Sequence, residues 1–457
     1  SGTVTVGGNF SATTGASNGV INMGSMAVDG TFTLSPHNTG AVTIVNDAGL
    51  TLAASTMGGT FSGTATTGNI TDTGALAITG TTTLVTSADD ATITLDTTTN
   101  AFTGAVTITT NDSSGTDADV TIDGGTTALV IAASTIDGDL TLTSDNASGI
   151  TDSGTVTVGG NFSATTGASN GVINVGSMAI DGTAALNTHG SGNATIVNDA
   201  GLSLAASTVG GALSATATTG NITDSGTLTI TGASTFITAA DGSNIVLDSA
   251  SNAFSNSVEM RADGGGETFG NITFVDSAAI DFATSAGSNG DLFINAGTDG
   301  AVGGNLSVTA TTGNITDTVA LAVTGTTTLV TSADNATITL DTSTNAFTGA
   351  MTITTNDSSG TDADVTIDGG TTALQIAAST IDGDLTLTSG NASGITDTGT
   401  VTVGGNFSAT TDASNGVINV GTMAVDGTVA LNTNGTGAGT IVNDAGLNFA
   451  ASTVGGA

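Results

Sequence analysis

Residues 153–174 read SGTVTVGGNFSATTGASNGVIN, and residues 1–22 carry the same phrase. Residues 398–419 repeat it with two changes, Thr398 and Asp412. The three copies begin 152 and then 245 residues apart. Repeats in which every position is copied together are typical of arrays that bury apolar surface only against neighbouring copies. The phrase therefore predicts a stacked repeat architecture and not a globular domain.

A second phrase, TATTGNITD, recurs at offsets of 152 and 93 residues, so the second copy is longer than the first. We predict a single continuous solenoid region over residues 1–457, with copies at 1–152 and 153–397 and a third that restarts over 398–457. The coil pattern is lost at about 255–303, where we expect divergent coils or, alternatively, a ligand-binding insertion. Because both ends fall inside a copy, we expect the chain to be part of a longer protein.

A shorter motif, apolar-x-Gly-x-apolar-x-apolar, recurs every 21–34 residues. The residue two before each anchoring glycine is apolar, and the residues one and three after it are small or polar. This period of two predicts strands with one buried face. We therefore predict an all-β fold, a parallel β-helix (β-solenoid) of about 19 stacked coils of 21–34 residues. Each coil is expected to hold two or three short strands joined by Gly, Asn, Asp or Ser corners.

Successive coils of such a stack lie about 4.8 Å apart, so the region predicts a rod on the order of 90 Å long. The residue before the anchoring glycine is aspartate in several coils but never in two consecutive ones. Stacked carboxylates at that distance would repel by roughly 1 kcal/mol even in water, which is consistent with their separation. These aspartates are Asp29, Asp137, Asp181, Asp382 and Asp426.

Charge and composition exclude several classes of function. The chain has one Arg, no Lys and 39 acidic residues, giving a net charge of −38. It therefore has no means to neutralise nucleic-acid phosphates or anionic lipid. No apolar run reaches membrane-spanning length, so we expect no direct membrane insertion in this region. The lack of Cys excludes disulfides and thiolate metal sites.

Three segments carry a resemblance to a known family: GNITDTGALAITGTTTLV (68–85), ITLDTTTNAFTGAVTI (93–108) and LVIAASTIDGDLTLTS (129–144). They resemble the β-strand repeats of filamentous haemagglutinin-like bacterial surface adhesins. The resemblance implies a right-handed β-helix shaft, an extracellular location at the bacterial cell surface, and a role in adhesion, aggregation or biofilm. It implies contacts with a host or neighbouring cell through regions outside this sequence, and it supplies no catalytic residues.

The best chemical candidate is an aspartate cluster in the longest coil, NDSSGTDADVTIDGG (111–125), with a copy 245 residues later. Calcium prefers several hard oxygen ligands on a loop, which carboxylates, Ser hydroxyls and carbonyls supply. The spacing matches neither an EF-hand nor the calcium-binding nonapeptide repeat. Calcium is the one cofactor suggested, and a solvated acidic loop is the alternative. The candidate ligands are Asp112, Asp117, Asp119, Asp123, Asp357, Asp362, Asp364 and Asp368.

The first hypothesis for function is a non-enzymatic extracellular shaft of a giant surface adhesin that acts as a rigid spacer. The second is a structural subunit of an extracellular filament, sheath or matrix fibre, joined end to end or laterally. An enzyme that cleaves acidic polysaccharides would need basic groups, and the chain has only Arg261. His37 and His189 form no nucleophile–base pattern in the sequence. We therefore expect no catalysis.

Overall fold

The computed structural model describes residues 2–111, 113, 118–262, 269–283, 291–294, 301–356, 358 and 362–456. All regular elements in these residues are β-strands, from β1 (Val4–Val6) to β54 (Gly439–Asn443). The strands pair in parallel, and the fold is a parallel β-solenoid of about 19 turns. The predicted fold class is confirmed. The described residues contain no helix with the length and apolar character of a membrane span.

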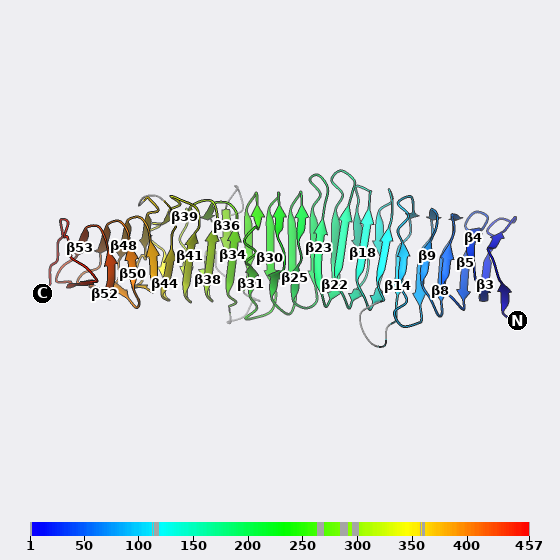
Figure 1. Ribbon diagram of the computed structural model, residues 1–457, viewed down its shortest axis with the longest axis horizontal. Coiled ribbons are helices and arrows are strands. Elements are labelled where there is room, and N and C mark those ends of the chain that lie inside the picture. The colour runs from blue at the N-terminus through cyan, green and yellow to red at the C-terminus, as the bar shows by residue number, and fades with distance from the viewer. Residues whose placement is uncertain are drawn as a thin grey trace. The chain divides into compact units, whose positions relative to one another are not determined.

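The chain divides into two compact units, and each is a solenoid in its own right. The first unit contains residues 1–218 and 230–232, and the second contains 219–229 and 233–457. In Figure 1 the strands of the first unit run from blue to green and those of the second from green to red. Within each unit neighbouring strands lie side by side, in agreement with the parallel pairings.

The core of the first unit is a set of apolar columns that run from coil to coil. In one column the first residue of each strand directly opposes the first residue of the next strand, and all are buried. Each such side chain contributes roughly 1.5–3 kcal/mol by leaving water. The strands are β6 (Leu50–Leu52), β9 (Ile70–Asp72), β12 (Ile93–Leu95), β15 (Val120–Asp123), β18 (Leu140–Ser144) and β21 (Phe162–Thr166).

The second unit builds the same column from later copies of the same sequence. Its first residues, from Ile315 to Phe407, are again buried and directly opposed. The long sequence repeat therefore reproduces, in each unit, the same pairing of buried residues between neighbouring strands. The strands are β39 (Ile315–Asp317), β42 (Ile338–Leu340), β45 (Val365–Asp368), β48 (Leu385–Ser389) and β51 (Phe407–Thr411).

The outward positions of the first column form a continuous line of threonines. Thr51, Thr71, Thr94, Thr121 and Thr141 oppose one another in successive coils. The Thr71 hydroxyl donates to Thr51 Oγ1 at 3.3 Å. β-Branched side chains suit a half-buried strand surface, so strand propensity explains the line without a ligand.

The anchoring glycines stack at a corner where successive coils approach most closely. A Cβ on Gly80 would lie 2.4 Å from the carbonyl carbon of Gly59, and one on Gly104 would lie 2.5 Å from that of Gly80. The Gly80 N–H donates to the Gly59 carbonyl at 3.2 Å. Glycine is required here because the adjacent coil occupies the space of a side chain.

Each copy contains one eight-residue strand that is followed by an asparagine, which is buried in the first two copies (Asn46 and Asn198) and half-buried in the third (Asn443). In the first copy β3 (Ile21–Val28) pairs with β5 (Val42–Asn46) and shifts register between Met23 and Met26. Asn46 Oδ1 accepts the Val28 N–H at 2.9 Å, and Nδ2 donates to the carbonyls of Val28 (3.0 Å) and Gly49 (2.7 Å). We call this arrangement the asparagine clasp. It binds the backbone N–H and carbonyl of Val28, which lies beyond Met26, the last residue that β3 pairs with β5.

The described part of the divergent stretch, 255–303, continues the strand ladder. Strand β33 (Val258–Arg261) pairs with β30 (Ser234–Thr238) and β36 (Asp291–Ile294). Strand β34 (Ile272–Asp276) pairs with β31 (Ile245–Leu247) and β38 (Leu306–Ala310). These strands therefore stack as coils although the glycine motif is lost.

The glycine corner gives a direct test of the stacking. We expect Gly80→Ala to lower the free energy of unfolding by about 1–3 kcal/mol, because the new methyl group meets backbone that has little freedom to move. Gly24→Ala is the matched control, since a Cβ at Gly24 meets nothing within 4 Å. Urea unfolding followed by circular dichroism would measure both. Equal stabilities for the two variants would contradict the assigned corner.

Candidate functional site

The structure separates the described members of the first aspartate cluster. Asp119 immediately precedes β15 and Asp123 ends it, so about 13 Å of extended strand lies between their backbones. Three further predicted calcium ligands, Asp112, Asp117 and Asp357, lie outside the described residues. The described pair alone does not converge on one point.

Asp119 takes part in a ladder that sequence reasoning missed. Its Oδ1 accepts the N–H of Asp139 in the next coil at 2.7 Å, and Asp139 Oδ1 accepts the N–H of Asn161 at 2.6 Å. In the second unit Asp364 Oδ1 accepts the N–H of Asp384 at the same 2.7 Å. Carboxylates therefore do stack in consecutive coils at this position, unlike the aspartates before the anchoring glycines. Each carboxylate binds a backbone N–H, which offsets the repulsion.

Asp123 and its copy Asp368 face a turn and not a shared cavity. Asp123 Oδ1 accepts the Gly125 N–H at 2.7 Å, and Asp368 Oδ1 accepts the Gly370 N–H at 2.8 Å. Burial raises the pKa of both carboxyl groups above its usual value, against the lowering effect of these bonds.

Asp362, the last predicted ligand, accepts the N–H of Asp364 through its backbone carbonyl at 3.0 Å. Within the described ranges, no three His, Cys, Asp or Glu side chains form a group that could hold a metal ion. Since part of each cluster lies outside those ranges, calcium binding stays a prediction.

The loop of the long coil is attached to the preceding coil by a serine. The Ser113 N–H and hydroxyl donate to the two carboxylate oxygens of Asp89 at 2.8 and 2.6 Å. In the second unit Ser358 binds Asp334 in the same way at 2.8 and 2.7 Å. The serine hydroxyl, followed by the serine N–H, lowers the pKa of each aspartate. These contacts connect neighbouring coils and leave the carboxylates ionised at neutral pH.

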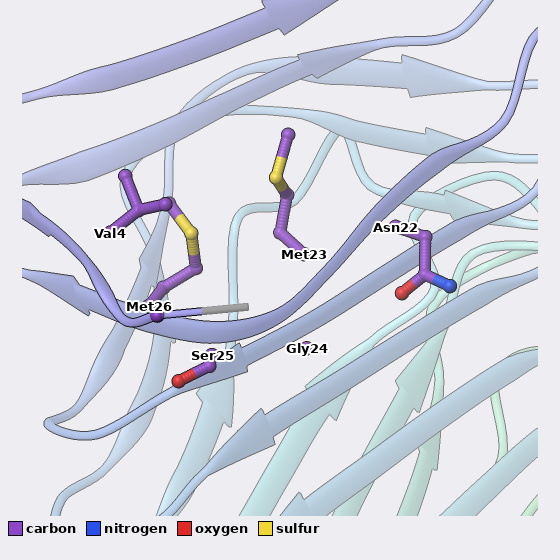
Figure 2. Close-up of a pocket in the computed structure, with 7 residues that line it drawn as sticks. Val4, Asn22, Met23, Gly24, Ser25 and Met26 are labelled. Atoms are coloured by element: carbon purple, nitrogen blue, oxygen red, sulfur yellow. The ribbon is translucent and has the colours of Figure 1, made fainter.

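A shallow surface groove beside the long strand recurs in all three copies. Its volume is about 310 Å³ next to Gly24 and Ser25, about 220 Å³ next to Gly176 and Ser177, and about 240 Å³ in the third copy. Figure 2 shows Val4, Met23 and Met26 around the first of these grooves.

Glycine creates the depression. A Cβ at Gly24, Gly176 or Gly421 would meet nothing within 4 Å, so this floor is open to solvent. Asp199 lines the second groove and Asp444 the third. The groove has room for a small polar group. Its composition indicates no particular ligand.

Other titratable residues in the described ranges have separate surroundings. His37 and His189 occupy corresponding turns, where their backbone carbonyls accept the N–H groups of Gly40 and Gly192. Arg261 Nε donates to Glu259 Oε1 at 2.7 Å on the same strand. Asp276 is 2% exposed, and burial raises its pKa to about 6. Of these, only Asp276 lies in the interior.

Comparison with known proteins gives one match. A family model described as repeats of unknown function (DUF5649) matches residues 39–109, 117–174, 191–261, 269–354 and 362–419. The first and third segments begin 152 residues apart, which is the offset of the sequence repeat. No curated protein and no solved structure matches the chain.

The Asp89–Ser113 contact is open to direct measurement. We expect Ser113→Ala to raise the pKa of Asp89 towards its usual value, because the hydroxyl donor is the main cause of the lowering. NMR titration of the Asp carboxylate carbons would show this. Asp334 in the same molecule is the internal control, since Ser358 still binds it. An unchanged Asp89, or an equal shift of Asp334, would contradict the assignment.

Proposed function

Because this chain belongs to the DUF5649 family, whose description names repeats and no activity, we propose that it is a structural repeat region. Its role is that of a non-enzymatic extracellular shaft of a large bacterial surface adhesin. It acts as a spacer that holds binding regions, located outside this sequence, away from the cell.

The observation that supports this proposal is the packing of successive coils along the stacking direction of each unit, over the residues that the structure describes. Buried phenylalanines, leucines and isoleucines fill successive coils, among them Phe61, Phe102 and Phe162 in the first unit and Phe347 and Phe407 in the second. Each added coil lengthens such a stack by about 4.8 Å without changing its cross-section. A sequence organised in this way is suited to providing length and stiffness.

The charge of the chain fits a solvated surface structure. With 39 acidic residues and one arginine, neighbouring chains repel one another in the absence of bridging cations. The resemblance to filamentous haemagglutinin-like repeats adds adhesion, aggregation or biofilm formation at the bacterial surface as the setting. Contacts with a host or neighbouring cell are then made by other parts of the protein.

A structural fibre is the second candidate. The copies repeat a long phrase almost without change at residues 1–22, 153–174 and 398–419. A coil that stacks on the coil above it in one chain also has the features needed to stack on a copy in another chain. Repeated end-to-end contacts of this kind would build a filament, a sheath or a matrix.

Electron cryo-tomography of the native cells separates the two candidates. The shaft predicts isolated thin rods that project from the cell surface and carry this sequence, as identified by an antibody against the repeat. Continuous or bundled filaments composed of the repeat would favour the fibre. A purely intracellular location of the antibody label would refute both.

Association between chains is expected to depend on divalent cations, because stacked carboxylates such as Asp119 and Asp139 present oxygen ligands on an acidic surface. We expect millimolar calcium to promote bundling of the purified chain and EDTA to reverse it, as measured by light scattering. A variant with Asp119, Asp139, Asp364 and Asp384 changed to Asn is the matched control and should bundle less. If calcium and EDTA leave scattering unchanged, cation bridging is wrong.

A further inference from the structure

Asn46 and Asn198 close equivalent coils of the first unit by the asparagine clasp. Asn198 Oδ1 accepts the Ile180 N–H at 2.8 Å, and its Nδ2 donates to the carbonyls of Ile180 (3.1 Å) and Gly201 (2.7 Å). Both asparagines are almost fully buried. A side-chain amide suits this place because it has an acceptor and two donors on one planar group.

In the second unit Asp276 occupies the position of this asparagine. The segment TFVDSAAI (273–280) aligns with TIVNDAGL (43–50), and TATTGNITD follows in both places. Asn46 opposes Ala65 in the following coil, and Asp276 opposes Ala310. These residues are the corresponding alanines of the TATTGNITD phrase. The sequence alignment and the strand register therefore agree.

The hydrogen bonds agree as well. Asp276 Oδ1 accepts the N–H of Phe254 at 3.1 Å, as Asn46 Oδ1 accepts that of Val28. The Ser277 N–H donates to the Asn252 carbonyl at 2.7 Å, as the Asp47 N–H donates to that of Met26 at 2.9 Å. Asp276 thus closes its coil with half of the clasp.

The other half of the clasp is the pair of hydrogen bonds that the asparagine Nδ2 donates to two carbonyls. Whether Asp276 can donate in this way depends on its protonation. An ionised carboxylate has only acceptors, so it cannot donate to the two carbonyls that the asparagine amide binds. A protonated carboxyl group has one donor and can restore one of those bonds. Ionisation therefore leaves those carbonyls without a donor from this side chain and adds a charge inside the coil, where the backbone N–H groups of Phe254, Ala278 and Ser277 are its hydrogen-bond donors.

The strands packed around Asp276 do not neutralise that charge. Strands β31 and β38 and the short β32 (Ala253–Phe254) contain no titratable residue. The single arginine of the chain, Arg261, binds Glu259. Asp281, on the next strand along the chain, accepts the hydroxyls of Thr316 and Thr318.

From this geometry we propose that the coil closed by Asp276 is a pH-sensitive weak point of the second unit, closed in mild acid and prone to local opening at neutral pH. In a solenoid each coil is held chiefly by its two neighbours, so one weakened coil determines where a unit opens first. Asp276 lies in the stretch where the repeat diverges. The equivalent coils have Asn46 and Asn198 at this position, and these side chains do not ionise.

The direction follows from the pKa of Asp276, which burial raises from 3.8 to about 6 in the folded chain. A raised carboxyl pKa adds stability that is complete below about pH 4 and is lost as the pH rises through about 6. Backbone N–H bonds from Phe254, Ala278 and Ser277 oppose the shift but do not cancel it. From pH 5 to pH 8 the opening equilibrium of this coil is expected to rise about tenfold.

Hydrogen exchange with mass spectrometry on the 457-residue chain tests the proposal. After correction for the intrinsic rate at each pH, peptides covering 252–254 and 272–282 should open about tenfold more at pH 8 than at pH 5. Asp276→Asn, which places the residue of the other copies in the clasp, should abolish this difference and retain the protection seen in acid.

The reciprocal variant is Asn46→Asp, which should give peptides covering 42–52 a pH dependence that the wild type lacks. If that variant fails to fold, Asp276→Asn still decides the question. Equal protection of the wild-type coil at pH 5 and pH 8 would overturn the proposal. So would a pH dependence that persists unchanged in Asp276→Asn.

Discussion

The structure depends on the parallel backbone hydrogen bonds that join each coil to the next in a fixed register. In the first unit the Leu50 N–H donates to the Asn69 carbonyl at 2.8 Å, and the Ile70 N–H donates to that of Thr92 at 2.9 Å. The next coils continue the ladder in the same way. A slip of one residue would turn the buried column outwards and the threonine line inwards. Register therefore fixes which positions are apolar and which are glycine, and it leaves length variation to the loops.

The corners need a second device, because strands end there and their backbone groups lose ladder partners. Short amide and carboxylate side chains supply it. In the second unit Asn244 Oδ1 accepts the N–H of Asn271 at 2.7 Å, and Asn271 Oδ1 accepts that of Asn305 at 2.8 Å. This explains a composition rich in Asn, Asp, Ser and Thr, since one short polar side chain per corner is enough to bind the neighbouring coil.

The position of a carboxylate in the stack determines whether its charge is tolerated. On the corner, Asp119 and Asp139 stack because each binds a backbone N–H, and because Asp119 is exposed to water and Asp139 is only half-buried. In the interior, Asp276 has the N–H bonds but not the water, and its pKa rises. Backbone N–H donors are present in both cases, and the loss of water around Asp276 is the main cause of its raised pKa. An acidic chain built as a stack can therefore carry a dense outer charge and still be sensitive to a single carboxylate inside.

The sequence by itself determined the fold class, the coil length and which strand positions are buried, because repetition with a period of two fixes which side of a strand is buried. It also pointed to aspartates in the long coil. Only the tertiary structure decided which side chains from different coils meet. The Asp139 N–H donates to the Asp119 carboxylate although the two residues are 20 positions apart in the sequence. Asp123 is only four positions from Asp119, but its carboxylate binds the Gly125 N–H in a turn. Contacts of this kind depend on how unequal loops bring coils into register, and that information is distributed over the whole stack.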